Sequence, residues 1–380
     1  MTSRHYLDHA STSPIRPEAV AAMNQWWAAG HGDPSRMHAE ALGARYEIEQ
    51  ARQQVAGCFG ARSREVVFTS GATESIAAAV RGASHRGAHQ VLSAVEHSAV
   101  RLSAQRLSAQ RHRATVVGVD RTGRVDPDDM AAAIEPHTAA VHCQWANHEV
   151  GTVQPVAEVV AACREQSPEV LIHVDAAAAA GQIPVSFEEI GADLLSISAH
   201  KFGGPPGVGA LLVRRGLRIV PLLEGGDQER ARRAGLENGA AIAGFGAACA
   251  ALLGGALEQE ASRARSQTDR LRHRAQEIEG VEFYGHATQR LPHLVCLGIR
   301  DVEPQAVLIA LDRAGVAAHS GSSCASESLE PSPVLEAMGV DAHHSLRFSV
   351  GWSTSDDDID AAAQALEEAL ADLRRLRLGG

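Results

Sequence analysis

SISAHKFGGPPGVG, at residues 196–209, contains the single lysine of the chain, Lys201. An apolar run ends just before Lys201, and a stretch rich in Gly and Pro follows it. A lysine at the carboxyl end of a strand can lose its proton when it is desolvated, and the neutral amine then attacks carbonyl groups. Arginine cannot be deprotonated in proteins, so it cannot serve this chemistry. The segment predicts a nucleophilic amine, with an ordinary surface lysine as the alternative.

Short apolar runs alternate with Ala-rich helical patterns on both sides of this segment. Such alternation predicts βαβ units and a mainly parallel sheet that is covered on both faces. Ligands of these sheets bind at the carboxyl ends of the strands. The runs that we predict to be strands are Glu65–Thr69, Gln90–Ala94, Thr115–Val119, Ala140–Gln144, Val170–Val174, Leu194–Ser198 and Gly209–Val213.

The rhythm changes after Val213, where a long helical stretch precedes three further runs. We expect these runs to be strands of a second sheet: Leu294–Gly298, Val316–Ala318 and Ser345–Val350. The prediction is an α/β fold with a large domain at 16–255, containing the seven-stranded sheet. Residues 1–15 and 256–380 would form a smaller α+β domain. Residues 356–376 predict a closing helix with acidic residues in its first turn and arginines in its last.

Composition and charge narrow the class of protein. The 380 residues carry a formal net charge of −11, which gives no electrostatic footprint for direct nucleic-acid binding. No apolar run is long enough to span a bilayer, and the polar N-terminus lacks a signal core. The six cysteines lack metal-ligand spacing, and five lie in apolar runs as small core residues. We therefore predict a cytoplasmic protein without a metal site.

Three further segments place polar residues just past predicted strands. Asp175 ends an apolar strand without a nearby cation, so it is a candidate partner for a pyridinium nitrogen or a simple helix cap. Thr73 lies where a helix begins in VFTSGATES, a place that suits a phosphate or a plain cap. His97 could stack on a planar cofactor and exchange protons, or it could be an ordinary loop histidine.

Two residues of the C-terminal part complete the set. Cys324 lies among Ser, Gly and Ala in HSGSSCASESLEPSPV, unlike the other five cysteines. This setting suits an exposed thiol nucleophile on a mobile loop, or an incidental cysteine in a turn. Arg347 lies in the strand-like SLRFSVG, where its guanidinium could bind a substrate carboxylate or form a surface salt bridge.

Together these motifs resemble cysteine desulfurases of the NifS/IscS type, which are pyridoxal-phosphate enzymes of fold type I. The resemblance runs from YLDHASTSP at 6–14 to Arg347, through SGATES, EHSAV, EVGTVQP, HVDA, SAHKFGGPPGVGAL and SGSSCASESLEPS. It implies catalytic roles for Lys201 as the Schiff-base lysine, His97 in proton transfer and Cys324 as the persulfide carrier. The cofactor-binding residues that it implies are Ala72, Thr73, His97, Asp175, Ser198, His200 and Lys201, and the substrate-binding residues are Asn147 and Arg347. We add His148 to the expected cofactor-binding residues, although it departs from the family pattern.

The resemblance also implies a reaction and partners. L-Cysteine would become L-alanine, and its sulfur would pass from Cys324 to an acceptor protein for iron–sulfur assembly, tRNA thiolation or DNA phosphorothioation. A homodimer is expected. The alternatives are another fold-type I enzyme, such as a selenocysteine lyase or an aminotransferase, and a non-catalytic sulfur carrier.

Four positions depart from the family pattern. Ala178 stands where Gln is common, Leu236 where Thr reaches the partner's phosphate, and His148 and Asp33 where Asn is common. Ala178 removes a donor to the cofactor's ring hydroxyl, and Leu236 removes a phosphate ligand. We expect weaker cofactor binding, partly offset by a hydrogen bond from His148, for which a loop histidine without ligand contact is the alternative.

Overall fold

The computed structural model describes residues 4–109, 111–320 and 331–378. Within these ranges a seven-stranded sheet has the order β2-β8-β7-β6-β5-β3-β4. Neighbouring strands are parallel except at β8, which runs antiparallel to both β2 and β7. The strands are β2 (Val66–Thr69), β3 (His89–Ser93), β4 (Arg113–Val117), β5 (Thr138–Gln144), β6 (Leu171–Asp175), β7 (Leu194–Ser198) and β8 (Gly209–Val213). This confirms the predicted fold class.

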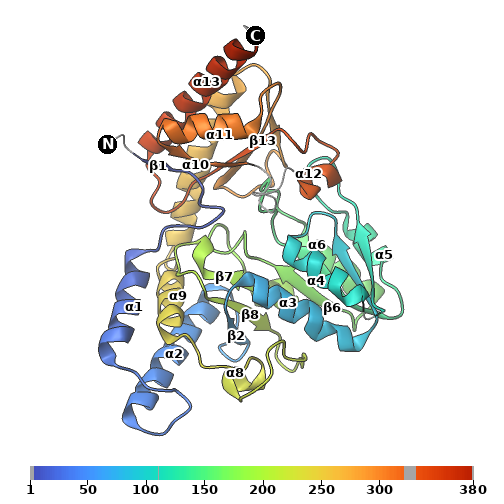
Figure 1. Cartoon of the computed structure of the whole chain (residues 1–380). Helices are drawn as coiled ribbons and strands as arrows, with labels where there is room; N and C mark the ends of the chain where they lie inside the picture. Colours follow the sequence, from blue (N-terminus) through green and yellow to red (C-terminus); the bar gives the residue numbers. More distant parts are fainter. Residues whose placement is uncertain (1–3, 110, 321–330, 379–380) are drawn as a thin grey trace.

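Helices cover both faces of this sheet (Figure 1). One face is covered by α3 (Ala72–Ala83) and α4 (Ser98–Ser108). The other face packs against α2 (Ala39–Cys58), α5 (Pro127–Ala132), α6 (Val156–Gln166) and α9 (Gly239–Ala250). The remaining short or outer helices of this part are α1 (Pro17–Ala29), η1 (Ser84–Arg86), α7 (Phe187–Ile190), η2 (Ala199–Lys201) and α8 (Gln228–Ala231).

Alternating side chains explain why the sheet is buried on both faces. Val91 of β3 belongs to the core on the face that α2, α5, α6 and α9 cover, whereas its neighbour Leu92 packs against α3 and α4. Leu212 and Leu211 of β8 divide in the same way. Since successive strand residues point to opposite faces, a continuous apolar run is what a doubly covered strand needs.

The C-terminal part has its own core around a four-stranded sheet of order β12-β13-β10-β9. Helix α10 (Ala256–Gln276) leads from α9 into this part, and both chain ends lie there in Figure 1. Its strands are β9 (Val281–Tyr284), β10 (Leu294–Ile299), β12 (His319–Ser320) and β13 (Ser345–Ser349). Its other helices are α11 (Pro304–Arg313), α12 (Pro333–Ala337) and α13 (Asp356–Leu378). The exact domain boundaries stay a prediction.

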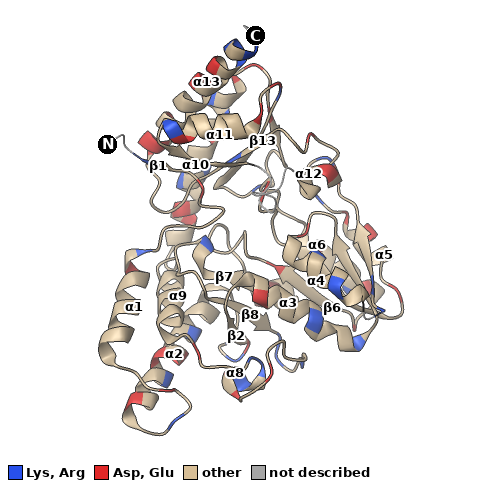
Figure 2. Cartoon of the chain, viewed as in Figure 1, with Lys and Arg blue, Asp and Glu red and all other residues tan. Residues whose placement is uncertain are grey.

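Helix α13 has the charge pattern that was predicted for the closing helix. Acidic residues fill its first turn and arginines its last, as Figure 2 shows. This arrangement complements the helix dipole. No helix among the described residues has the length and apolar character needed to cross a membrane.

One strand assignment was wrong. Val316–Ala317, β11, does not join the second sheet but pairs in parallel with β1 (His5–Tyr6) in a two-stranded ribbon. The extended conformation of this run was predicted correctly, but its pairing partner lies more than 300 residues away in the sequence. Such a distant pairing leaves no pattern in the local sequence. This pairing ties the N-terminus to the C-terminal part, and Asp8 forms a further isolated bridge to Ser349.

Candidate active site

Lys201 lies just beyond β7, in the short helix η2, and its side chain is half-buried. Its Nζ donates hydrogen bonds to the carbonyl oxygens of Ala10, at 2.6 Å, and Ser11, at 3.1 Å. These acceptors come from the N-terminal segment, so the amine lies between the two parts of the chain. The amine is therefore oriented by neutral acceptors.

Asp175 is the last residue of β6 and is buried. Its Oδ1 accepts a hydrogen bond of 3.0 Å from the backbone N–H of Ala177. Burial raises the pKa of Asp175 to about 6, against the opposing effects of that bond and of Lys201. A cationic ring nitrogen beside this carboxylate would offset the desolvation cost.

His97 and His148 form an imidazole pair. Their ring centroids are 4.9 Å apart and the rings meet edge to face at 64°. His97 caps α4, because its Nδ1 accepts a hydrogen bond from the N–H of Ala99 at 3.1 Å. Burial, aided by the charge of Lys201, lowers the pKa of His97 to about 4. Burial also lowers the pKa of His148, and its buried Nε2 has no hydrogen-bond partner.

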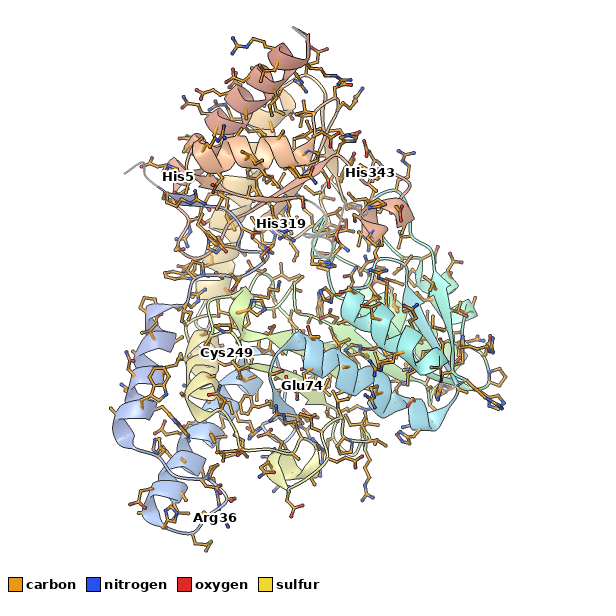
Figure 3. All side chains as sticks on the ribbon, viewed as in Figure 1. His5, Arg36, Glu74, Cys249, His319 and His343 are labelled. Atoms are coloured by element: carbon orange, nitrogen blue, oxygen red, sulfur yellow. The ribbon has the colours of Figure 1, made fainter. Side chains whose placement is uncertain are left out.

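The N-terminus of α3 forms another part of the site. Gly71 precedes the helix with a φ of +150°, and a Cβ on Gly209 of β8 would lie only 2.7 Å from the Gly71 Cα. Glycine at these positions lets the strand approach the helix end closely. Glu74 of this turn, labelled in Figure 3, is paired with Arg233 through an Nε–Oε1 bond of 2.9 Å. Its charge is thus compensated, and the helix end stays suited to an anion.

Arg347 belongs to β13 but reaches toward the large sheet, and it is almost completely buried. Its Nη1 donates to the carbonyl oxygen of His148 at 2.8 Å. Its Nη2 donates to the Ser11 hydroxyl at 2.8 Å and to the Asp8 carboxylate at 3.0 Å. Its buried Nε has no hydrogen-bond partner. Arg347 thus remains a candidate for binding a substrate carboxylate, and this role stays a prediction.

These groups surround one cavity of about 590 Å³. It is lined by nine of the predicted site residues: Ala72, Thr73, His97, His148, Asp175, Ser198, His200, Lys201 and Arg347. All the strand ends concerned lie at the carboxyl edge of the sheet, where parallel strands deliver their ligand-binding residues.

Asn147 is not among the cavity-lining residues. Its side chain is buried in the turn after β5, where Nδ2 donates to the Val95 carbonyl at 3.2 Å. Its Oδ1 accepts from the N–H groups of Glu149 and Val150. These contacts give Asn147 a structural role, and its role in substrate binding stays a prediction. Cys324 lies outside the described residues.

The departures from the family pattern fall at different distances from the cavity. Ala178 lines it together with His148. Leu236, by contrast, is 64% exposed, and Asp33 pairs with Arg36 in the loop between α1 and α2. The N-terminal residues Asp8 and Ser11 were missed as site residues. Their only sequence signal was the resemblance of YLDHASTSP, because hydrophobic patterning says nothing about contacts with Lys201 and Arg347.

The residues present fit pyridoxal phosphate. The buried carboxylate of Asp175 suits a cation, and the N-terminus of the twelve-residue helix α3 with the hydroxyls of Thr73 and Ser198 suits an anion. The only lysine of the sequence, Lys201, lines the same cavity. The fold and this donor set define a pyridoxal-phosphate-dependent enzyme of the α/β class.

Comparison with known proteins identifies the family. Residues 5–362 match the model described as aminotransferase class-V. The chain is 40% identical over 380 residues to the cysteine desulfurase IscS of Dictyoglomus turgidum, covering 98% of this chain and 95% of that one. It is 37% identical to the cysteine desulfurase IscS of Methanosarcina thermophila, with 98% and 93% covered. The chain belongs to the aminotransferase class-V family.

Solved structures agree. A NifS-like protein superposes with a TM-score of 0.92 at 29% identity, covering 97% of this chain and all of the other. SspA in complex with cysteine superposes with a TM-score of 0.80 at 27% identity, covering 92% of this chain. These likenesses agree with the α/β fold described above.

Proposed function

We propose that this enzyme is a cysteine desulfurase, which converts L-cysteine to L-alanine and passes the sulfur on as a persulfide. The observation that carries the proposal is the meeting of Lys201, Asp175 and Arg347 around one cavity. Lysine and aspartate fit the cofactor, and the arginine fits the carboxylate of an amino acid. The substrate, L-cysteine, is inferred from the related proteins, which are named cysteine desulfurases.

Each cavity residue has a proposed task. Pyridoxal phosphate, when bound, supplies an electron sink for bonds broken at the amino-acid substrate. Lys201 would hold the cofactor covalently, because it is the sole lysine and half-buried, and its amine could carry protons when it is released. Asp175 would pair with the ring nitrogen and favour its protonated form, and neutral His97 would lie against the ring and could accept a proton. Thr73, with Ala72, Ser198 and His200, binds the phosphate.

Cys324 is the proposed sulfur carrier. Its thiolate attacks the substrate sulfur, a new S–S bond forms, and the carbon–sulfur bond breaks. The electron pair of the broken bond remains on the substrate carbon, which takes up a proton and leaves as alanine. A Cys324→Ala variant should keep its cofactor but form no protein-bound persulfide. Cys58→Ala is the matched control, since that partly exposed thiol lies outside the cavity.

The deciding experiment incubates the cofactor-loaded protein with L-cysteine and a reductant and measures alanine and sulfide. We expect both products in equal amounts, and none from Lys201→Arg, which keeps the charge but loses the nucleophile. An aminotransferase would require a 2-oxo acid and release no sulfide. A loaded wild-type protein that yields neither alanine nor sulfide would refute the proposal.

We also propose a homodimer and a protein acceptor for the sulfur. Support for the dimer comes from exposed large apolar side chains on the α1–α2 hairpin and on the segments flanking α8: Trp27, Met37, Leu42, Tyr46, Leu223 and Leu236. Helix α8 is tied to α2 by the buried Arg52–Glu229 ion pair, so these segments share one side of the molecule. Clustered exposed apolar residues are typical of interaction surfaces.

A further inference from the structure

Glu96 is a buried carboxyl group without a role in the proposed chemistry. It lies in the turn between β3 and α4, directly before His97, and is 1% exposed. Its Oε1 accepts hydrogen bonds from the backbone N–H of Gln144, at 2.7 Å, and from the Ser93 hydroxyl, at 2.8 Å. Its buried Oε2 has no hydrogen-bond partner.

These bonds join the two strand ends on which the site depends. Gln144 is the last residue of β5 and lies in register with Asp175 of β6. The side chain of Gln144 donates back to the Val95 carbonyl at 2.6 Å. The turn that carries His97 is therefore hydrogen-bonded to the end of β5 at two points, the backbone carbonyl of Val95 and the side chain of Glu96. The contacts are short and fully buried, so the geometry of His97 depends on them.

The surroundings of Glu96 disfavour a negative charge. The titratable groups that face it are Asp175 on β6 and the Cys143 thiol on β5, and neither is a cation. Among the described residues no basic side chain donates a hydrogen bond to it. Burial and then Asp175 raise the pKa of Glu96 to about 8. Because a buried carboxylate without a cation is costly, the neutral acid is the stable form at neutral pH.

We propose that Glu96 is a positioning residue that acts as a neutral carboxylic acid, fixing the His97 turn to the end of β5 and leaving the charge beside the cofactor ring to Asp175. This inference rests on the proposed function, because the ring is that of the cofactor. Ionisation of Glu96 at alkaline pH would add a second negative charge near the ring nitrogen and change its environment.

The test compares two substitutions of Glu96 in the cofactor-loaded enzyme. Glu96→Gln is neutral and keeps an oxygen that accepts both hydrogen bonds. Glu96→Leu has a similar size and no acceptor. The measurements are the visible absorbance and circular dichroism of the bound cofactor between pH 6 and 9.5, together with kcat and KM for L-cysteine.

We expect Glu96→Gln to keep the visible circular dichroism and kcat of the wild type at pH 7, and to lose an alkaline spectral change near pH 8. Glu96→Leu should change the visible circular dichroism and lower kcat about ten-fold, with a smaller change in KM. A ten-fold loss is what the removal of about one or two buried hydrogen bonds would cause. Glu229→Gln is the control. That glutamate is also buried but is paired with Arg52, so its variant should keep the alkaline change.

Two results would overturn the inference. If Glu96→Gln keeps the alkaline spectral change of the wild type, Glu96 does not titrate as proposed. If Glu96→Leu keeps the dichroism and kcat of the wild type, Glu96 does not position His97. Should Glu96→Leu fail to fold, Ser93→Ala removes one of the two bonds and takes its place. The cofactor spectra test Glu96 even if the wild type releases no sulfide, a result that would refute the proposed function instead.

Discussion

Asp175 is buried at a cost in stability that the proposed contact with the cofactor would remove. Burial raises its pKa from 3.8 to about 6, so the folded chain binds a proton there more tightly than the unfolded chain does. The corresponding stability is complete below pH 3.8 and is lost as the pH rises through 6. At pH 8 the buried carboxylate then costs about 3 kcal/mol in the cofactor-free protein.

Asp175→Asn should therefore stabilise the cofactor-free protein in a pH-dependent way. Asn keeps the acceptor for the Ala177 N–H and carries no charge. We expect a gain of about 1.5 kcal/mol at pH 5 that grows to about 3 kcal/mol at pH 8, measured by denaturant unfolding. With cofactor present the order should reverse, since the variant lacks the partner for the ring nitrogen. An equal gain at both pH values would contradict a raised pKa.

His148 allows a second test of single residues. His148 lines the cavity together with Ala178, the position where the family commonly carries Gln. Nε2 of His148 has no hydrogen-bond partner and lies 3.6 Å from Oε1 of Glu149. If His148 supplies the missing hydrogen bond, His148→Ala should weaken cofactor binding about ten-fold in equilibrium dialysis. Adding Ala178→Gln to that variant should restore most of the affinity, and in the wild type it should add little. If the His148→Ala variant binds the cofactor with unchanged affinity, the imidazole does not contact the cofactor.

The position of a residue at the cavity could be predicted from the sequence where a reactive or charged side chain follows a predicted strand. Lys201 and Asp175 met both conditions, and His97 and Thr73 gained weight from the family motifs. The contacts of Arg347 with Asp8 and Ser11 span more than 330 positions and have no periodic signature. Asn147 is a different case: the amide bonds the backbone of its own turn and of Val95, and its role in substrate binding stays a prediction.

Among the elements, strands buried on both faces were the most predictable. Their apolar runs are short, continuous and bounded by polar or glycine residues, which is the pattern that a doubly covered sheet requires. The strands β1 and β12 have two residues each, so neither could show a pattern. Such short strands owe their existence to tertiary contacts.

The segment at α8 stores backbone strain. Glu229, Arg230 and Ala231 all have positive φ, at 48°, 58° and 59°, and Figure 2 shows basic residues around this turn. The buried bonds of Glu229 to Arg52 and to the Phe68 N–H hold the segment in place. Left-handed conformations cost a residue other than glycine about 1 kcal/mol or more.

Ala231→Gly should therefore raise the free energy of unfolding by up to about 1 kcal/mol, because glycine adopts this φ without a steric penalty. The control is Ala371→Gly in an exposed part of α13. This substitution should lower the free energy of unfolding by about 1 kcal/mol. Thermal denaturation of both variants beside the wild type gives the comparison. Destabilisation by both substitutions would show that the left-handed turn is not strained at Ala231.

In the whole molecule, the site belongs to neither part of the chain alone. The large sheet supplies Lys201, Asp175 and His97, while Arg347 comes from the second sheet and is bonded to the N-terminal segment. Helix α10 and the β1–β11 ribbon tie these segments together. The proposed binding of substrate by Arg347 would therefore depend on the relative placement of the two parts.

The proposed dimer is the property of the whole molecule that is simplest to test. Met37 and Tyr46 of the α1–α2 hairpin are 83% and 62% exposed, and Figure 3 places Arg36 at the tip of this hairpin, away from the C-terminal part. Burying such side chains against a second copy would stabilise association, and a buried charge there would oppose it. A Met37→Glu, Tyr46→Glu double variant should therefore shift the mass measured by light scattering from dimer to monomer. Leu102→Glu, at a 60% exposed leucine of α4, should leave the mass unchanged. A monomeric wild type, or a double variant that stays dimeric, would exclude this surface as the interface.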